Sequence, residues 1–288
     1  MPSVDAQTRG TDLDPHDHAC WVFTSEREHR RVVTSFLTAG LARGERVVFL
    51  GSPGERVRLV DDYLDEAGVE VETLRASGQL VTGVAEDEYL GDGEFDADAR
   101  LRRYASGARA AVADGYTGLR VATEVSWLHG CPTARHDWPS FELRADLLAA
   151  TLPFTALCAY DGRHWRPDEL AVLRSLHGRC LGPHADTAGF RLYGQRDGSL
   201  RLRGELDLAH AERVRSLLLS AVDGGGCRVL DITGLTFIDA TGLRSVAAAG
   251  RLMVRQHGAA TIRGSSAFFQ RIWTLSGLDR LEPAIKVT

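Results

Sequence analysis

Lysine is almost absent from this chain of 288 residues: Lys286 is the only one, and every other cation of fixed charge is an arginine. No Gly-x-x-x-x-Gly-Lys-[Ser/Thr] sequence occurs, so the phosphate-cradling loop of P-loop nucleotide hydrolases is missing together with its charge. The shortage also excludes the strand lysine of a protein kinase and argues against a Schiff-base lysine. Gly-x-Ser-x-Gly is absent as well, so nothing supports nucleophilic catalysis. We therefore expect a protein that is not an enzyme.

Long apolar runs and paired cysteines are lacking too. The longest uncharged apolar run, residues 147–160, contains a proline and falls short of the roughly 20 residues that span a bilayer. The polar, acidic N-terminal stretch has no apolar core of a secretory signal. The cysteines form no Cys-x-x-Cys pair and are odd in number, which fits a reducing compartment; they are Cys20, Cys131, Cys158, Cys180 and Cys227. We expect a cytoplasmic protein without a membrane partner.

The arginines are scattered and no aromatic residues are interleaved with them, so we expect no nucleic-acid partner either. The length and the 44% hydrophobic content allow two domains of about 100 to 200 residues, each with its own core. A break from Gly182 to Gly189 interrupts the helical pattern of residues 168–181. The sequence therefore predicts one domain at residues 14–182 and a second at residues 188–285.

The first domain alternates strand and helix patterns. Strands are predicted at residues 19–24, 46–51, 119–123 and 155–161. Helices are predicted at residues 26–42, 55–67, 96–114, 141–151 and 168–181. This alternation indicates an α/β domain with a mostly parallel sheet.

Five segments of the first domain together resemble the MEDS family, a sensory domain known from methanogens and methylotrophs and often attached to regulators. They are His16-Asp-His-Ala-Cys20, residues 36–50, Gly115-Tyr-Thr-Gly-Leu-Arg120, Glu124-Val-Ser-Trp127 and Leu157-Cys-Ala-Tyr-Asp161. The resemblance implies a sensor of a small molecule whose chemistry it does not define. Residues 36–50 also look like the second strand of a RecA-like ATPase. We therefore expect a RecA-like sensory domain without hydrolysis, and nucleotide binding through arginines and backbone amides remains an alternative.

Two groups of residues suggest a ligand pocket in this domain. His16, His18 and Cys20 alternate along an extended segment, so all three would point to one face. Cys158 could approach from a neighbouring strand and complete a metal site, but we favour buried core cysteines and expect no metal and no cofactor.

Glu124 and Asp161 each end an apolar strand, where open α/β sheets place ligand contacts. Trp127, Tyr160 and Trp165 could form the walls. Ordinary packing with solvated carboxylates is the alternative. The candidate pocket is His16, His18, Cys20, Glu124, Trp127, Cys158, Tyr160 and Asp161.

A turn at residues 239–242 joins a buried strand to a helix in the second domain. The apolar run 227–231 follows a glycine turn and indicates a strand. Helical spacing begins at Thr241, with apolar residues at Leu243, Val246, Ala247, Leu252 and Val254. Asp239 then occupies the N-cap, where its carboxylate can accept from the N–H groups of Thr241 and Gly242 for about 1 kcal/mol.

Three segments in order resemble the STAS family of anti-sigma factor antagonists over residues 188–285. They are Gly204-Glu-Leu-Asp207 with the helix that follows, Asp239-Ala-Thr-Gly-Leu243, and residues 265–278. The resemblance implies a small mixed sheet with helices, and binding of an anti-sigma factor kinase so that a sigma factor is released. In the family the serine after the aspartate takes a phosphate. Ala240 stands there in this chain, which leaves Thr241 as the nearest substitute acceptor.

We therefore expect a two-domain regulator in which the first domain controls the second. Its expected partners are an anti-sigma factor of the serine-kinase type and a small-molecule ligand, and a homodimer is left open. The expected partner surface is Asp207, Asp239, Ala240, Thr241, Gly242 and Arg244. The alternative is a ligand-sensing scaffold, similar to a stressosome component, that acts through its own oligomer.

Overall fold

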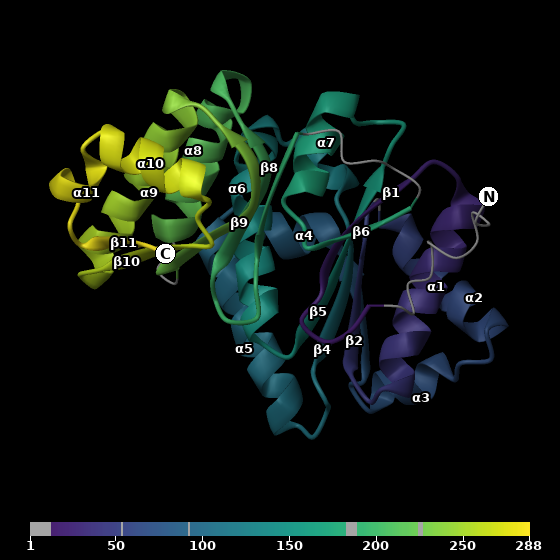
Figure 1. Ribbon diagram of the computed structural model, residues 1–288. Coiled ribbons are helices and arrows are strands. Elements are labelled where there is room, and N and C mark those ends of the chain that lie inside the picture. The colour runs from purple at the N-terminus through teal and green to yellow at the C-terminus, as the bar shows by residue number, and fades with distance from the viewer. Residues whose placement is uncertain (1–12, 53, 92, 183–188, 224–226) are drawn as a thin grey trace, which may run out of the picture. The chain divides into compact units, whose positions relative to one another are not determined.

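The computed structural model describes residues 13–52, 54–91, 93–182, 189–223 and 227–288, which form two compact units, each built on its own sheet (Figure 1). Both units combine strands with helices, so the predicted α/β class is confirmed. None of the helices in these ranges is long and apolar enough to span a bilayer. Residues 183–188, where we expect the linker, lie outside the described residues.

The sheet of the first unit is wholly parallel, in the order β3-β2-β4-β5-β1-β6. The central strands β1, β4 and β5 are buried along their whole length, as expected of parallel strands covered on both faces. Their apolar sequences therefore predict the sheet well. The strands are β1 (His18–Phe23), β2 (Arg46–Gly51), β3 (Leu80–Val84), β4 (Leu119–Glu124), β5 (Phe154–Asp161) and β6 (Arg179–Leu181).

Helices α1 and α2 lie on one side of these strands and α5 on the other (Figure 1). α1 begins directly after Ser25, whose hydroxyl accepts from the Glu28 N–H at 3.3 Å. The helices before the linker are α1 (Glu26–Ala42), α2 (Glu55–Glu66), α3 (Val71–Ala76), α4 (Ala85–Leu90), α5 (Ala97–Ala113), α6 (Pro132–Thr151) and α7 (Pro167–Ser175), with the 3-10 helix η3 (Ser126–Gly130).

The short helices α3, α4 and η3 were not predicted, and three further features of this part differ from the prediction. The helix expected at residues 168–181 ends at Ser175, and residues 179–181 form strand β6, in which Cys180 pairs with Cys20 of β1. The helix expected at 141–151 begins earlier, at Pro132, where proline suits the first helical turn because it lacks an N–H. The edge strand β3 was not predicted, since only its first residue is buried and its alternation is weak.

The sheet of the second unit has the order β11-β10-β9-β8-β7. β7 and β8 are antiparallel and the other pairs are parallel, which confirms the predicted small mixed sheet. Its elements are β7 (Phe190–Gly194), β8 (Leu200–Leu206), α8 (Leu208–Asp223), β9 (Val229–Ile238), α9 (Ala240–His257), β10 (Ala260–Arg263), α10 (Ala267–Leu275), α11 (Leu278–Leu281) and β11 (Ile285–Val287).

The core of the second unit contains the apolar faces of α8 and α9. It also contains residues that precede the linker, namely Leu143 of α6 and Val172 and Leu176 at α7. This core therefore draws on parts of the chain on both sides of residues 183–188.

Candidate functional site

The predicted cap at the start of α9 is present. Asp239 has extended backbone geometry, and its Oδ1 atom accepts from the Thr241 and Gly242 N–H groups at 2.8 Å each. Its own N–H donates to the Leu206 carbonyl at 3.2 Å, which ties the cap to the end of β8. The turn is thus held from both the helix and the sheet.

Gly242 allows α9 to lie against the strand below it. A Cβ atom at this position would stand 2.4 Å from the Leu206 carbonyl oxygen and 2.9 Å from Cγ1 of Ile238. No side chain fits there, so Gly242 packs on backbone and Ala240 is left exposed on the outer side of the first turn. The residue after the aspartate therefore faces solvent, as a modified or partner-binding position requires.

Thr241 is less accessible than Ala240. It is half-buried, and its Oγ1 accepts from the Arg244 guanidinium at 3.2 Å. Arg244 itself is exposed one turn further along the helix. The Thr241 hydroxyl is therefore already in contact with a side chain of its own helix.

Asp207 caps the neighbouring helix α8. Its Oδ1 accepts from the Ala209 N–H at 3.0 Å and the His210 N–H at 3.2 Å, and it pairs with the His210 ring at 2.7 Å. Desolvation acts to raise the pKa of Asp207, but the contacts with His210 outweigh it and the pKa lies below its usual value. Asp207 therefore carries a negative charge at neutral pH beside the end of β8.

Two large apolar side chains near these caps are exposed, and sequence reasoning missed both. Leu208, the first residue of α8, is 74% exposed, and Phe237, near the end of β9, is 49% exposed. Phe237 is the register partner of Glu205 on β8, so it lies at the same end of the sheet as Asp239. Exposed apolar side chains beside capped helix ends give this edge a surface on which a protein partner can bury area.

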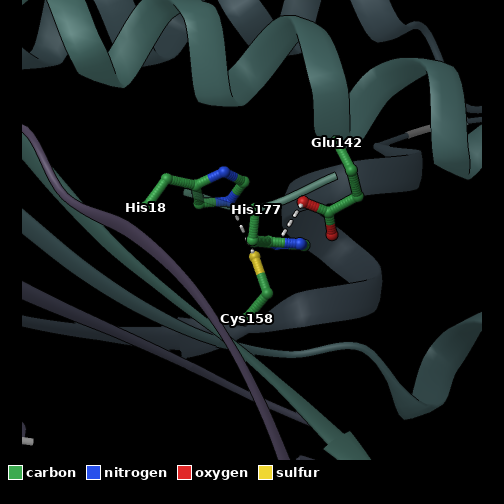
Figure 2. A group of neighbouring side chains, drawn as sticks. All are labelled: His18, Glu142, Cys158 and His177. Atoms are coloured by element: carbon green, nitrogen blue, oxygen red, sulfur yellow. Dashed lines mark hydrogen bonds and ion pairs between the residues drawn. The ribbon is translucent and has the colours of Figure 1, made fainter. Parts of the chain in front are cut away.

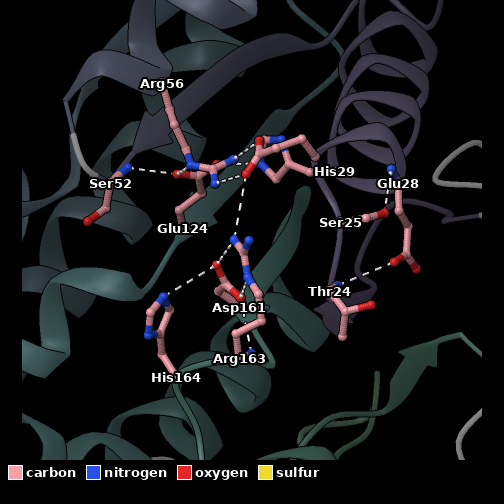
Figure 3. A network of polar contacts seen from close by, with 11 residues as sticks. Thr24, Ser25, Glu28, His29, Ser52, Arg56, Glu124, Asp161, Arg163 and His164 are labelled. Atoms are coloured by element: carbon pink, nitrogen blue, oxygen red, sulfur yellow. Dashed lines mark hydrogen bonds and ion pairs between the residues drawn. The ribbon is translucent and has the colours of Figure 1, made fainter.

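The strand-end carboxylates of the first unit belong to one polar network (Figure 3). Glu124 ends β4 and is almost fully buried. Its Oε2 accepts from the Ser52 N–H at 2.8 Å and lies 3.4 Å from Nε of Arg56, and its Oε1 pairs with the buried His29 ring. This carboxylate has partners from the residue after β2, from α1 and from α2, so it is not simply solvated.

Asp161, at the end of β5, belongs to the same network. Arg163 donates to it through Nε at 2.8 Å and through its backbone N–H at 3.1 Å (Figure 3). Burial acts to raise the pKa of Asp161, but these hydrogen bonds outweigh it and lower the pKa. Glu26 connects the two carboxylates, because it pairs with Arg56 at 2.6 Å and with Arg163 at 3.6 Å.

The N-terminus of α1 is where a P-loop protein would hold a phosphate. Here the Ser25 hydroxyl accepts a hydrogen bond from the Glu28 N–H, and the Thr24 N–H donates to the Glu28 carboxylate at 3.4 Å (Figure 3). Glu26 adds a second carboxylate to the first turn. The carboxylates of Glu26 and Glu28 therefore occupy the helix N-terminus, where the helix dipole would otherwise attract a phosphate.

The aromatic candidates lie in a buried ring cluster. Trp127 stacks on Tyr89 with centroids 5.1 Å apart and meets Trp138 edge-on at 5.5 Å. Trp138 in turn donates through Nε1 to the Tyr160 hydroxyl at 3.0 Å, and Tyr160 contacts Trp165 at 5.4 Å. Burial raises the pKa of Tyr89 well above its usual value, so its hydroxyl stays protonated.

The expectation that His16, His18 and Cys20 share one strand face is wrong for His16. β1 begins at His18, and His16 precedes it in a turn with φ 77°. Cys20 and Cys158 are register partners on β1 and β5, as the idea of a neighbouring strand anticipated. His18 reaches Cys158, with Nε2 and Sγ 3.2 Å apart (Figure 2).

Comparison with known proteins shows which families the two parts of the chain resemble. A family profile described as the MEthanogen/methylotroph, DcmR Sensory domain, or MEDS, matches residues 17–178. The chain belongs to the MEDS family. A second profile, described as Mlab, STAS domain, matches residues 193–284, so a STAS domain follows the MEDS domain. The two domains make this a sensory and regulatory protein of the anti-sigma factor antagonist type.

Other comparisons add little to the MEDS and STAS assignments. None of the curated proteins is similar enough to count as a relative. Crystal structures of the DUF1998 helicase MrfA, bound to DNA and AMPPNP or to DNA alone, share 10% and 9% identity with this chain at a TM-score of 0.37. They cover 94% of this chain, which spans less than two fifths of the helicase chains. A likeness of this size supports no conclusion about helicase activity.

Six of the eight pocket candidates of the MEDS domain lie in three separate environments, and His16 and Cys20 belong to none of them. Glu124 and Asp161 lie in the polar network, Trp127 and Tyr160 in the aromatic cluster, and His18 beside Cys158. The sequence analysis missed four of their partners on helices, namely His29, Arg56, Tyr89 and Trp138. Spacing along the sequence does not show which helical side chains reach these strand residues.

Proposed function

We propose that the STAS domain binds an anti-sigma factor of the serine-kinase type through the edge formed by Asp207, the turn at residues 239–242 and Arg244. The observation that carries this proposal is the cap at Asp239 with Gly242 packed on Leu206, which presents residue 240 to solvent. The family places its phosphorylated serine at that position. Because Ala240 has no hydroxyl, the partner holds this protein without inactivating it there.

The MEDS domain supplies the control in this proposal, through a small molecule bound near the polar network or the aromatic cluster. The carboxylates of Glu124 and Asp161 are buried, as are the rings of the aromatic cluster, and they lie at or beside the carboxyl ends of parallel strands, where open α/β sheets bind ligands. The function is binding rather than turnover. The carboxylates at the start of α1 and the lack of a phosphate-binding lysine support this view.

The direct test measures the affinity of the full-length protein for each kinase-type anti-sigma factor encoded in the same genome. Arg244→Ala removes an exposed cation at the proposed edge, and we expect the affinity for the cognate partner to fall about tenfold, the loss typical of a well-placed interface arginine. Arg255→Ala is the matched control, because it removes an exposed arginine from the same helix about 16 Å away. An affinity that neither substitution changes, or no binding to any such factor, would contradict the proposal.

The scaffold alternative has one observation in its favour. α10 and α11 carry exposed apolar side chains away from the α9 turn in sequence, namely Phe268, Leu275 and Leu281. Such residues can mediate self-association. Light scattering would favour this alternative if the protein forms a defined oligomer that Phe268→Ser dissociates while Arg244→Ala leaves it intact.

A further inference from the structure

A hollow between α1 and α2 is lined by three arginines of the MEDS domain. Its volume is about 570 Å³, within the range of about 300 to 1,000 Å³ that small-molecule sites occupy. We call it the arginine hollow; its polar side chains include Arg27, Arg30, Arg31 and Ser35 on α1 and Tyr63 and Glu66 on α2. All of them belong to one compact unit, on the side of the sheet where α1 and α2 lie (Figure 1). We propose that the arginine hollow binds a small molecule that carries a phosphate monoester group.

One wall of the hollow is a row of polar side chains on α1. Arg27, Arg31 and Ser35 follow one another at intervals of four residues, so they share a helix face with a rise of about 6 Å from one to the next. Arg27 and Arg31 are exposed, and they also line a smaller hollow of about 260 Å³ with Ser25 and Glu28. Like charges four residues apart repel, and cations in the first turns oppose the helix dipole. The stability of α1 therefore does not account for this row, and a bound anion would relieve its repulsion.

The charge of the hollow is opposite to that of the domain around it. Residues 17–178 contain 18 arginines and 26 aspartates and glutamates, a formal net charge of −8. The side chains that line the hollow include three arginines and one carboxylate, that of Glu66, a net charge of +2. Arg30 pairs with Glu66 and lies over the Tyr63 ring at 5.2 Å, whereas Arg27 makes no ion pair within the described part of the chain. Positive charge is therefore concentrated where a small anion can reach it.

The size of this charge and the kind of donor favour phosphate. A phosphate monoester carries about −1.5 to −2 charges at pH 7, which matches the +2 of the lining, whereas a single carboxylate carries −1. The planar guanidinium group can donate two parallel hydrogen bonds to a phosphate. Burial leads the causes that raise the pKa of Tyr63, so its hydroxyl is protonated at neutral pH and can donate as well, as can the Ser35 hydroxyl.

The site differs from the phosphate site of a P-loop protein. Glu26 and Glu28 cover the N-terminus of α1, but neither is among the described residues that line the arginine hollow. The ligand would therefore be held by side chains and not by helix N–H groups. The Tyr63 ring meets the His29 ring edge-on at 6.4 Å, so this wall of the hollow adjoins the polar network around Glu124 without sharing its carboxylates.

The test measures small molecules on the purified full-length protein, so its outcome does not depend on the anti-sigma partner. We expect isothermal titration calorimetry with glycerol 3-phosphate, at fixed ionic strength and pH 7.5, to show one saturable site per chain. Arg27→Ala should raise the dissociation constant about tenfold, since it removes a charge-assisted hydrogen bond. Arg58→Ala is the matched control, because Arg58 is exposed on α2 but lines neither hollow, and it should bind as the wild type does.

Two further measurements separate phosphate recognition from other attractions. Lowering the pH from 7.5 to 5 should weaken the binding of glycerol 3-phosphate, because the second pKa of a phosphate monoester is about 6 and its charge falls in this range. Succinate, a dicarboxylate, should bind more weakly than glycerol 3-phosphate at pH 7.5.

Absence of saturable binding of glycerol 3-phosphate would overturn the proposal, as would a dissociation constant that Arg27→Ala leaves unchanged. Equal affinity for succinate would overturn the assignment to phosphate. Flotation with vesicles that contain phosphatidic acid tests a membrane source of the same chemical group. Capture by these vesicles without binding of the soluble monoester would also contradict the proposal.

Discussion

Gly242→Ala sets two opposing effects against each other at the start of α9. Gly242 is not among the glycines with positive φ, so alanine can adopt its backbone conformation, and helix propensity alone predicts a gain of about 1 kcal/mol. The structure predicts the opposite. The new Cβ would stand 2.4 Å from the Leu206 carbonyl oxygen, a backbone atom that cannot rotate away. Overpacking of this kind costs about 3 kcal/mol at the upper end of its range, which leaves a net loss of about 2 kcal/mol.

For a unit of about 100 residues, that loss lowers the unfolding temperature by roughly 10 °C. Differential scanning calorimetry of the full-length protein measures it. Gly250→Ala is the control on the same helix, since its Cβ would meet the Cδ1 end of the Ile285 side chain, which can turn aside. We expect a change below about 1 kcal/mol there. If Gly242→Ala raised the unfolding temperature, the close packing of the turn on β8 would be wrong.

Three further predictions follow from the same structure. The carboxylates of Asp231 and Asp197 have lowered pKa values, to about 2 for Asp197. For Asp231 burial acts in the opposite direction, but hydrogen bonds from Arg201, Thr233 and Arg263 outweigh it; for Asp197 hydrogen bonds from Ser199 lead. The stability that these two carboxylates provide is complete above the usual aspartate pKa and disappears as the pH falls from about 4 towards 2 and below. Asp231→Asn should therefore make the free energy of unfolding depend less on pH in this range, as measured by acid unfolding followed by circular dichroism. An unchanged slope would contradict the assignment. Purified protein should not hydrolyse ATP or GTP in a phosphate-release assay, and activity that survives Lys286→Ala would mean that arginines replace the missing lysine. We expect cooperative unfolding of each half when residues 1–183 and residues 186–288 are expressed alone. The unfolding midpoint of 186–288 should be lower, because its core loses the side chains of α6 and α7. If neither half shows a cooperative transition, the prediction of two domains is contradicted.

The spacing of residues along the sequence predicted the features that depend on residues close to one another in the chain. A carboxylate directly before helical spacing identifies an N-cap, so Asp239 could be placed before the structure was known. Uninterrupted apolar runs likewise identified β1, β2, β4 and β5. The reason that residue 242 must be glycine was out of reach, because the Leu206 carbonyl comes from another strand.

The candidate pocket shows the limit more clearly. Glu124 and Asp161 were found because they end apolar strands, but their partners His29 and Arg56 lie on helices. No local signal marks His16 as a residue with positive φ, so its exclusion from the strand could not be anticipated.

The difference between residues 240 and 241 leads to the decisive experiment on the STAS edge. Ala240 is exposed and has no hydroxyl, whereas the Thr241 hydroxyl is half-buried and accepts from Arg244. Thr241 also points about 100° away around the helix from its neighbour. A phosphate of about −1.5 to −2 charges on residue 240 would stand beside Asp239, where repulsion and bulk can break the complex with a partner.

The cognate anti-sigma kinase and ATP should therefore be incubated with wild type, Ala240→Ser and Thr241→Ala, and phosphate measured by mass spectrometry of peptides. The account predicts little or no labelling of the wild type and of Thr241→Ala, and clear labelling of Ala240→Ser at residue 240. Rapid, stoichiometric labelling of the wild type that Thr241→Ala abolishes would contradict it and make Thr241 the switch.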